Sequence, residues 1–121
     1  MRTYKGSCHC GKVVFEIETD LDKAVTCNCS ICRRRNAVMH RVDAEHFRII
    51  QGEDDLVLYQ FNTATAHHYF CGTCGVYPFH RPRAAPEAYT VNVFCLDGVG
   101  DEEIAALTIG QFDGRAFSTV E

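Results

Sequence analysis

Several features that would assign this chain to a class are missing from it. The 121 residues contain no tryptophan, no apolar run long enough to cross a bilayer, no linker, no low-complexity stretch and no hydrophobic signal segment in the opening MRTYKGSCHC. These absences argue against a membrane-spanning or exported protein. They predict a single domain over residues 1–121, located in the cytoplasm and without a membrane partner. Composition does not determine the oligomeric state.

An excess of basic residues is also missing. Sixteen acidic residues outnumber twelve basic ones, so the formal net charge is −4, and basic residues are not interleaved with aromatic ones. An acidic surface repels phosphate groups, so nucleic acid is not an expected partner. The one basic run, Arg33-Arg34-Arg35, directly follows a cysteine motif.

Cysteine is what the chain has in abundance, and seven of the eight lie in three motifs. Cytosolic thiols are kept reduced, and the C-x-C spacing is unfavourable for a disulfide, so metal binding is the better interpretation. Seven thiolates are more than one tetrahedral zinc site needs and one fewer than two closed sites need. The motifs are GSCHCG with Cys8 and Cys10, CNCSIC with Cys27, Cys29 and Cys32, and FCGTCG with Cys71 and Cys74.

Spacing alone allows two groupings of these cysteines. In the first, Cys8 and Cys10 join Cys71 and Cys74, which leaves the CNCSIC motif as a compact three-ligand cluster. In the second, Cys29-x-x-Cys32 pairs with Cys71-x-x-Cys74 as an ordinary zinc ribbon, which leaves three cysteines that make a poorer local site. Both groupings stay open at the level of spacing.

The remaining residues form short segments of β-branched and aromatic residues separated by turns. Such a pattern predicts a mostly β, antiparallel domain with little helix, in which zinc sites at strand turns join the sheets. Turn residues stand at Gly52 to Asp55 and at Asn62-Thr63. Strands are expected at residues 12–18, 37–42, 47–50, 56–61, 67–70, 76–80 and 89–95, and helical turns at 31–35 and 101–107, the latter with Asp101 as its cap.

The order of the motifs, C-x-C, then C-x-C-x-x-C, then F-C-x-x-C-G, resembles the glutathione-dependent formaldehyde-activating enzyme family, which includes the centromere protein V domain. The similarity extends to GSCHCGKVVFEI, HFRIIQGEDDLVLYQF, HYFCGTCGVYPFHRPR, VNVFCLDG and FDGR, and so covers essentially the whole chain. The enzymes that gave the family its name are longer than this chain, and many short members share its cysteines.

The resemblance implies an Mss4-like (β-tent) fold and two Zn²⁺ sites. It implies a structural zinc on Cys8, Cys10, Cys71 and Cys74, and a catalytic zinc with one position for water or substrate on Cys27, Cys29 and Cys32. It also implies a carbon–sulfur lyase-type activity, in which a glutathione-like thiol adds to a small aldehyde or the adduct is cleaved. The expected partner is therefore a small thiol or aldehyde, with glutathione as one candidate.

Other residues have plainer interpretations that compete with functional ones. A histidine could complete the three-cysteine site or act as a base, although packing is the usual role of each. Cys95 is expected as a small buried residue, with a reactive thiol facing the open zinc as the alternative. The arginine run is a solvated helix face or a clamp for substrate carboxylates. The histidines considered are His9, His40, His67, His68 and His80, and the aromatic residues that pack or line a pocket are Tyr77, Phe79 and Tyr89.

A non-catalytic zinc module that binds a protein partner is the alternative to an enzyme. An accessible, exchangeable three-sulfur site would favour the enzyme, whereas two inert zinc ions and an exposed apolar patch would favour the module.

Overall fold

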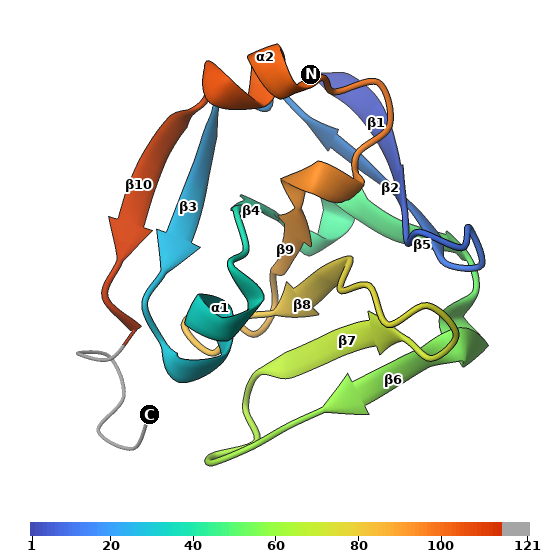
Figure 1. Ribbon diagram of the computed structural model, residues 1–121, viewed down its shortest axis with the longest axis vertical. Coiled ribbons are helices and arrows are strands. Elements are labelled where there is room, and N and C mark those ends of the chain that lie inside the picture. Colours follow the sequence, from blue (N-terminus) through green and yellow to red (C-terminus); the bar gives the residue numbers. More distant parts are fainter. Residues whose placement is uncertain (115–121) are drawn as a thin grey trace.

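Two β-sheets of unequal size make up most of the computed structural model, which describes residues 1–114 (Figure 1). The smaller sheet has the order β1-β2-β5 and the larger β10-β3-β4-β9-β8-β7-β6. The strands are β1 (Arg2–Ser7), β2 (Val14–Thr19), β3 (Lys23–Cys27), β4 (Met39–Val42), β5 (Phe47–Gln51), β6 (Leu56–Tyr59), β7 (His67–Cys71), β8 (Phe79–Arg81), β9 (Tyr89–Asn92) and β10 (Thr108–Phe112).

Helices are few and short, which confirms the mostly β fold. They are α1 (Ser30–Arg35), α2 (Asp101–Ala105) and the 3₁₀ helices η1 (Ala44–His46), η2 (Glu53–Asp55) and η3 (Val93–Cys95). None of the helices in residues 1–114 is long and apolar enough to cross a membrane.

Strand pairing is antiparallel in every pair but one of the described sheets. The exception is β10, which runs parallel to β3 from Thr108 beside Lys23 to Phe112 beside Cys27. This pairing brings the segment after β10 to the CNCSIC motif.

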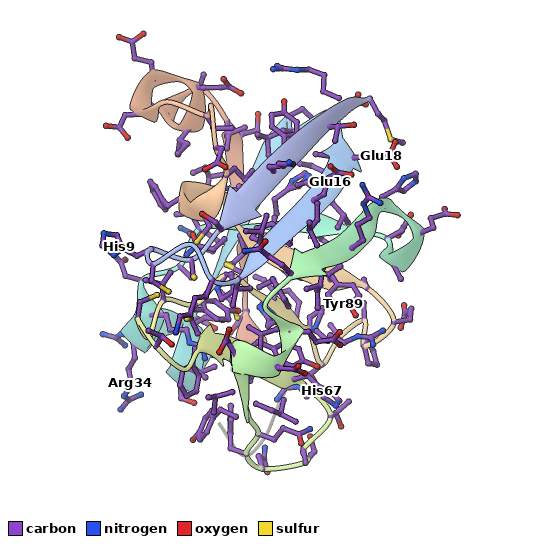
Figure 2. All side chains as sticks on the ribbon, turned by 90° about the vertical axis from the view of Figure 1, so that its right-hand side faces the viewer. His9, Glu16, Glu18, Arg34, His67 and Tyr89 are labelled. Atoms are coloured by element: carbon purple, nitrogen blue, oxygen red, sulfur yellow. The ribbon has the colours of Figure 1, made fainter. Side chains whose placement is uncertain are left out.

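The main core lies between the two sheets. Phe15 and Ile17 of β2 are fully buried, and Phe79 and Val91 of the larger sheet meet them from β8 and β9. The rings of Phe15 and Phe79 pack edge to face at 5.4 Å between centroids. Alternation along β2 places Glu16 and Glu18 on the opposite, outer face (Figure 2).

Several expected boundaries are wrong for local reasons. The strand expected at 89–95 ends at Asn92, because the Asn92 side chain accepts a 3.1 Å hydrogen bond from the Phe94 amide and the chain turns into η3. Asp101 does not cap α2; Gly100 holds that position, without a side-chain bond. The strand expected at 76–80 begins only at Phe79, because the Val76 carbonyl accepts a hydrogen bond from Cys71 in the turn.

Candidate metal centre and its cavity

One group of cysteines lies where the two sheets meet. Cys8 and Cys10 lie in the turn between β1 and β2, Cys71 is the last residue of β7, and Cys74 lies in the turn that follows it. The four sulfur atoms lie within 4.8 Å of one another, with Cys10 3.6 Å from both Cys8 and Cys71. Four sulfurs around a tetrahedral zinc stand about 3.8 Å apart, given Zn–S bonds of about 2.3 Å. The donor set therefore fits a closed zinc site.

Backbone amides surround this four-cysteine group and donate to its sulfurs. The amide of Val13 lies 3.3 Å from the Cys8 sulfur, and the amides of Thr73 and Cys74 lie 3.4 and 3.5 Å from that of Cys71. Such N–H···S bonds stabilise thiolate ligands and fix their direction. The turn that supplies the Thr73 and Cys74 amides ends at Gly75, whose φ of 78° lies in the left-handed region that glycine adopts without strain.

A second group, Cys27, Cys29 and Cys32, lies at the junction of β3 and α1. Cys27 is the last residue of β3, Cys29 is the N-cap of α1, and Cys32 lies one turn into the helix. The Cys29 amide donates to the Cys27 sulfur at 3.4 Å. The three sulfurs lie within 4.8 Å of one another, and among residues 1–114 no histidine or carboxylate belongs to the group. As a donor set it offers three soft ligands and leaves a tetrahedral ion one position short.

Without a metal, the three thiols share their protons. Thiol donation from Cys29 and Cys32 lowers the pKa of Cys27 to about 3, and the same sharing raises the pKa of Cys32. A bound cation would replace these protons, so metal affinity at this three-cysteine cluster should fall as the pH falls.

The segment after β10 closes against this cluster. The Gly114 amide donates to the Cys27 sulfur and helps to lower its pKa. A Cβ atom at Gly114 would lie 2.6 Å from that sulfur and 2.9 Å from the Cys29 Cβ, so only glycine fits. Asn28 holds the segment in place: its backbone N–H donates to the Phe112 carbonyl at 3.3 Å, and its side-chain amide donates to the Asp113 carboxylate at 2.9 Å. Sequence reasoning noted FDGR but gave Gly114 no role, and Arg115 of that motif lies outside the described residues.

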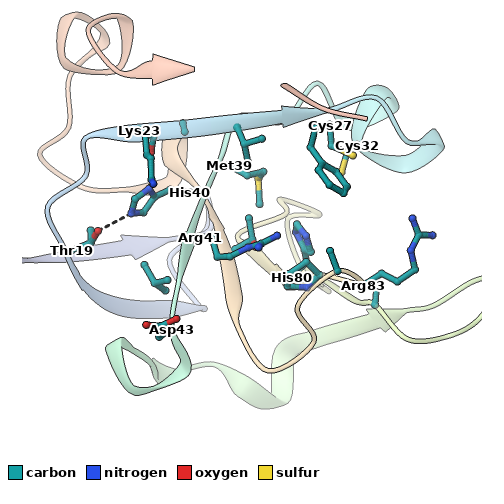
Figure 3. A pocket seen from close by; sticks show the side chains of 18 of the residues that line it. Thr19, Lys23, Cys27, Cys32, Met39, His40, Arg41, Asp43, His80 and Arg83 are labelled. Atoms are coloured by element: carbon teal, nitrogen blue, oxygen red, sulfur yellow. Dashed lines mark hydrogen bonds between the residues drawn. The ribbon is translucent and has the colours of Figure 1, made fainter. Parts of the chain in front are cut away.

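A cavity of about 790 Å³ opens beside the three-cysteine cluster (Figure 3). All three cysteines line it, as do Met39, Arg41, His68, His80, Arg83 and Thr90. At its other end, His40 donates from Nδ1 to the Lys23 carbonyl at 2.7 Å, and its Nε2 lies 2.7 Å from the Thr19 hydroxyl. His40 is therefore held by its neighbours and does not act as a ligand.

Two buried histidines line the cavity near the cysteines. Burial lowers the pKa of His68 to about 4 and that of His80 to about 3, so both rings are neutral at pH 7. Tyr77 hydrogen-bonds to Nδ1 of His80. Arg35 donates to Nδ1 of His68 at 3.3 Å, and its guanidinium lies 3.6 Å from the centre of the Tyr77 ring. These contacts attach α1, and with it Cys29 and Cys32, to β7 and to the segment before β8.

The remaining sequence candidates lie elsewhere. His9 is exposed and points outward, as does Arg34 (Figure 2). Arg33 and Arg34 thus form a solvated face, and only Arg35 turns inward. Burial raises the pKa of Cys95 to about 12, and the nearby charges that raise it further are those of Cys8, Cys74 and Asp97. Cys95 therefore lies toward the four-cysteine group and does not face the open cluster.

Comparisons with known proteins identify the family of this chain. The family model described as glutathione-dependent formaldehyde-activating enzyme matches residues 3–112. The chain belongs to that family. It is also similar to the crystal structure of a Rhodobacter sphaeroides protein, a structural genomics target, with 42% identity and a TM-score of 0.80 over 88% of this chain and 99% of that chain. The family resemblance read from the cysteine motifs is thereby confirmed.

This member of the formaldehyde-activating family also has site residues that sequence motifs did not indicate. Arg41 follows no motif, and its position in the cavity depends on the pairing of β4 with β9. The contact between Tyr77 and His80 spans three residues around Pro78, a spacing with no recognised meaning in a sequence. Tyr77 was expected to pack, and it does, in a small second core with Ala37 and Met39.

Proposed function

We propose that this protein is a zinc-dependent, carbon–sulfur lyase-type enzyme that adds a thiol, such as glutathione, to a small aldehyde, or cleaves the adduct. The observation that supports it best is the three-cysteine cluster, which has no fourth protein ligand within residues 1–114 and lines a cavity of about 790 Å³. A closed structural site would not need such a cavity. Cys27, Cys29 and Cys32 are assigned to this catalytic zinc, and Cys8, Cys10, Cys71 and Cys74 to a structural zinc.

Zinc held by the three cysteines would supply a Lewis acid with one free position for a thiolate or a carbonyl oxygen. In the reaction, the thiol sulfur forms a bond to the carbonyl carbon, the C=O double bond becomes a C–OH single bond, and the thiol proton ends on that oxygen. Thiols add to aldehydes unaided, so the main contribution of the cavity is to hold the two reactants together.

The protein residues around the cluster have supporting parts in this scheme. His68 and His80 have pKa values of about 4 and 3, which makes them neutral but weak bases. The thiol proton is therefore expected to leave through water in the open cavity. Arg35 and Tyr77 hold α1, so that Cys29 and Cys32 face the space where the substrates meet.

The test is the rate of exchange between formaldehyde and S-hydroxymethylglutathione, measured by NMR magnetisation transfer with the zinc-loaded protein. Acceleration above the uncatalysed rate is expected, and Cys29→Ser should abolish it while one zinc per chain remains. Glu102→Gln, on the exposed face of α2, serves as the matched control and should keep the wild-type rate. Exchange at the uncatalysed rate with both metals bound would contradict the proposal.

A protein-binding module is a second candidate, because β6 forms one edge of the larger sheet and exposes apolar side chains. Val57, Leu58 and Tyr59 are 41, 46 and 48% exposed. Edge strands with unpaired backbone groups can accept a strand from another chain. Full zinc occupancy without acceleration in the exchange assay would favour this candidate.

Cytoplasmic location and the single domain over 1–121 stay predictions.

A further inference from the structure

A row of polar side chains crosses the sheet on the face that lines the cavity. In the pairing of β4, β9, β8 and β7, Arg41 lies opposite Thr90, Thr90 opposite His80, and His80 opposite His68. Directly paired residues on neighbouring strands point to the same face of a sheet. All four residues line the cavity, and the Cys29 charge acts on the pKa of both histidines. The row therefore leads from Arg41 to the three-cysteine cluster.

Arg41 is the member of the row whose charge has no partner. Its guanidinium makes no hydrogen bond or ion pair with any residue in the described part of the chain, whereas Arg35 donates to His68 and Arg83 donates to the Gly114 carbonyl. Figure 3 shows the Arg41 side chain extending across the cavity toward His80 and away from Asp43. A guanidinium with five free donors facing a cavity is suited to a carboxylate or another oxyanion.

Thr90, beside Arg41 in the row, gives a second and independent indication. The residue is only 4% exposed, and within residues 1–114 its hydroxyl has no hydrogen-bond partner. Leaving a buried hydroxyl unpaired is costly, and such groups need an explanation such as a water, an ion or a ligand. An oxyanion bound by Arg41 would place an oxygen atom near Thr90 that can accept a hydrogen bond from its hydroxyl group.

We propose that Arg41, with Thr90 beside it, binds the carboxylate group of a substrate whose reacting atom lies at the three-cysteine cluster. The proposal rests on the proposed function and adds that the cavity selects acidic reactants over neutral ones. At the end of the cavity around Thr19, the carboxylates of Glu18, Asp20 and Asp22 outnumber two cations, the Lys23 ammonium and the Met1 amine. The excess negative charge there disfavours a carboxylate, whereas Arg41 attracts one. Either the thiol or the aldehyde can carry the carboxylate, because the S–H bond adds across the C=O bond in the same way in both cases.

The test compares matched ligands by calorimetric titration of the zinc-loaded protein. 3-Mercaptopropionate is paired with neutral 2-mercaptoethanol, and glyoxylate with neutral glycolaldehyde. Arg41→Gln should weaken the acidic member of one pair by about tenfold or more, the effect of losing a charge-assisted hydrogen bond, and leave its neutral member unchanged. Arg34→Gln is the matched control, since Arg34 is exposed on α1 and donates to the Ser30 carbonyl.

The outcomes separate the two proposals. Selective weakening in the thiol pair assigns the carboxylate to the thiol, and selective weakening in the aldehyde pair assigns it to the aldehyde. Equal weakening of acidic and neutral members, no weakening in either pair, or the same effect from Arg34→Gln overturns the assignment of Arg41. Charge-selective binding without any acceleration of adduct exchange would leave the Arg41 site standing and refute the proposed reaction.

Discussion

Replacing Gly114 by alanine should loosen the metal held by the three-cysteine cluster and leave the other metal untouched. The added Cβ would lie 2.6 Å from the Cys27 sulfur, roughly 1 Å closer than an ordinary contact of about 3.5–4.0 Å. The segment after β10 must then withdraw, and the amide that donates to the Cys27 sulfur withdraws with it. Loss of such a supporting hydrogen bond typically lowers metal affinity by about 10- to 100-fold.

Competition with a chromophoric zinc chelator measures this effect. Gly114→Ala should release one zinc per chain at about 10- to 100-fold lower chelator concentration, while the second zinc is released as in the wild type. Gly110→Ala is the matched control, because Gly110 lies on β10, just before the segment that holds Gly114, and a Cβ there meets nothing within 4 Å. Equal retention of both metals in the two variants, or equal loss of both metals in Gly114→Ala, would refute the reasoning.

Three further predictions concern the fold and its metals. Acidification from about pH 6.5 to pH 4 should lower the free energy of unfolding by up to about 1.4 kcal/mol per pH unit through His80, because burial lowers its pKa to about 3 and keeps the ring neutral only in the folded state. Urea titrations at a series of pH values should show a weaker pH dependence of the unfolding free energy for His80→Gln than for the wild type. An identical pH dependence would contradict this prediction. Gly6→Ala should destabilise the fold by about 1–3 kcal/mol, since the added Cβ would lie 2.3 Å from the buried Phe15 ring. An unchanged melting temperature would show that this steric overlap does not occur. A chelator should remove the metal of the three-cysteine cluster while circular dichroism shows an intact fold, and the metal of the four-cysteine group only when the protein unfolds. Simultaneous release of both metals would argue against distinct roles for the two sites.

The cysteine motifs carried most of what could be predicted about the site. Sequence spacing allowed the zinc-ribbon grouping of Cys29 and Cys32 with Cys71 and Cys74, and only the fold shows that the two C-x-x-C pairs lie in separate groups. Family resemblance had pointed to the same separation. Local rules also predicted α1 closely, at 31–35 against Ser30–Arg35.

Long-range pairing explains what sequence reasoning missed. Strands β1, β3 and β10 were not expected, and two of them carry weak local signals: β10 is exposed along its whole length and contains Gly110, and β3 has a single buried residue, Ala24. The two strands pair with each other across more than 80 residues of sequence, a contact that no local pattern encodes. Because this pairing places Gly114 against Cys27, the closure of the site was equally hidden.

Anomalous diffraction at the zinc edge tests the central claim most directly. Crystals of the zinc-loaded protein should show two peaks, one surrounded by the sulfurs of Cys8, Cys10, Cys71 and Cys74, and one bound by those of Cys27, Cys29 and Cys32 with a non-protein ligand on the cavity side. A second ion closed by a fourth protein ligand such as His68 or His80, or no second ion at full zinc loading, would contradict the account.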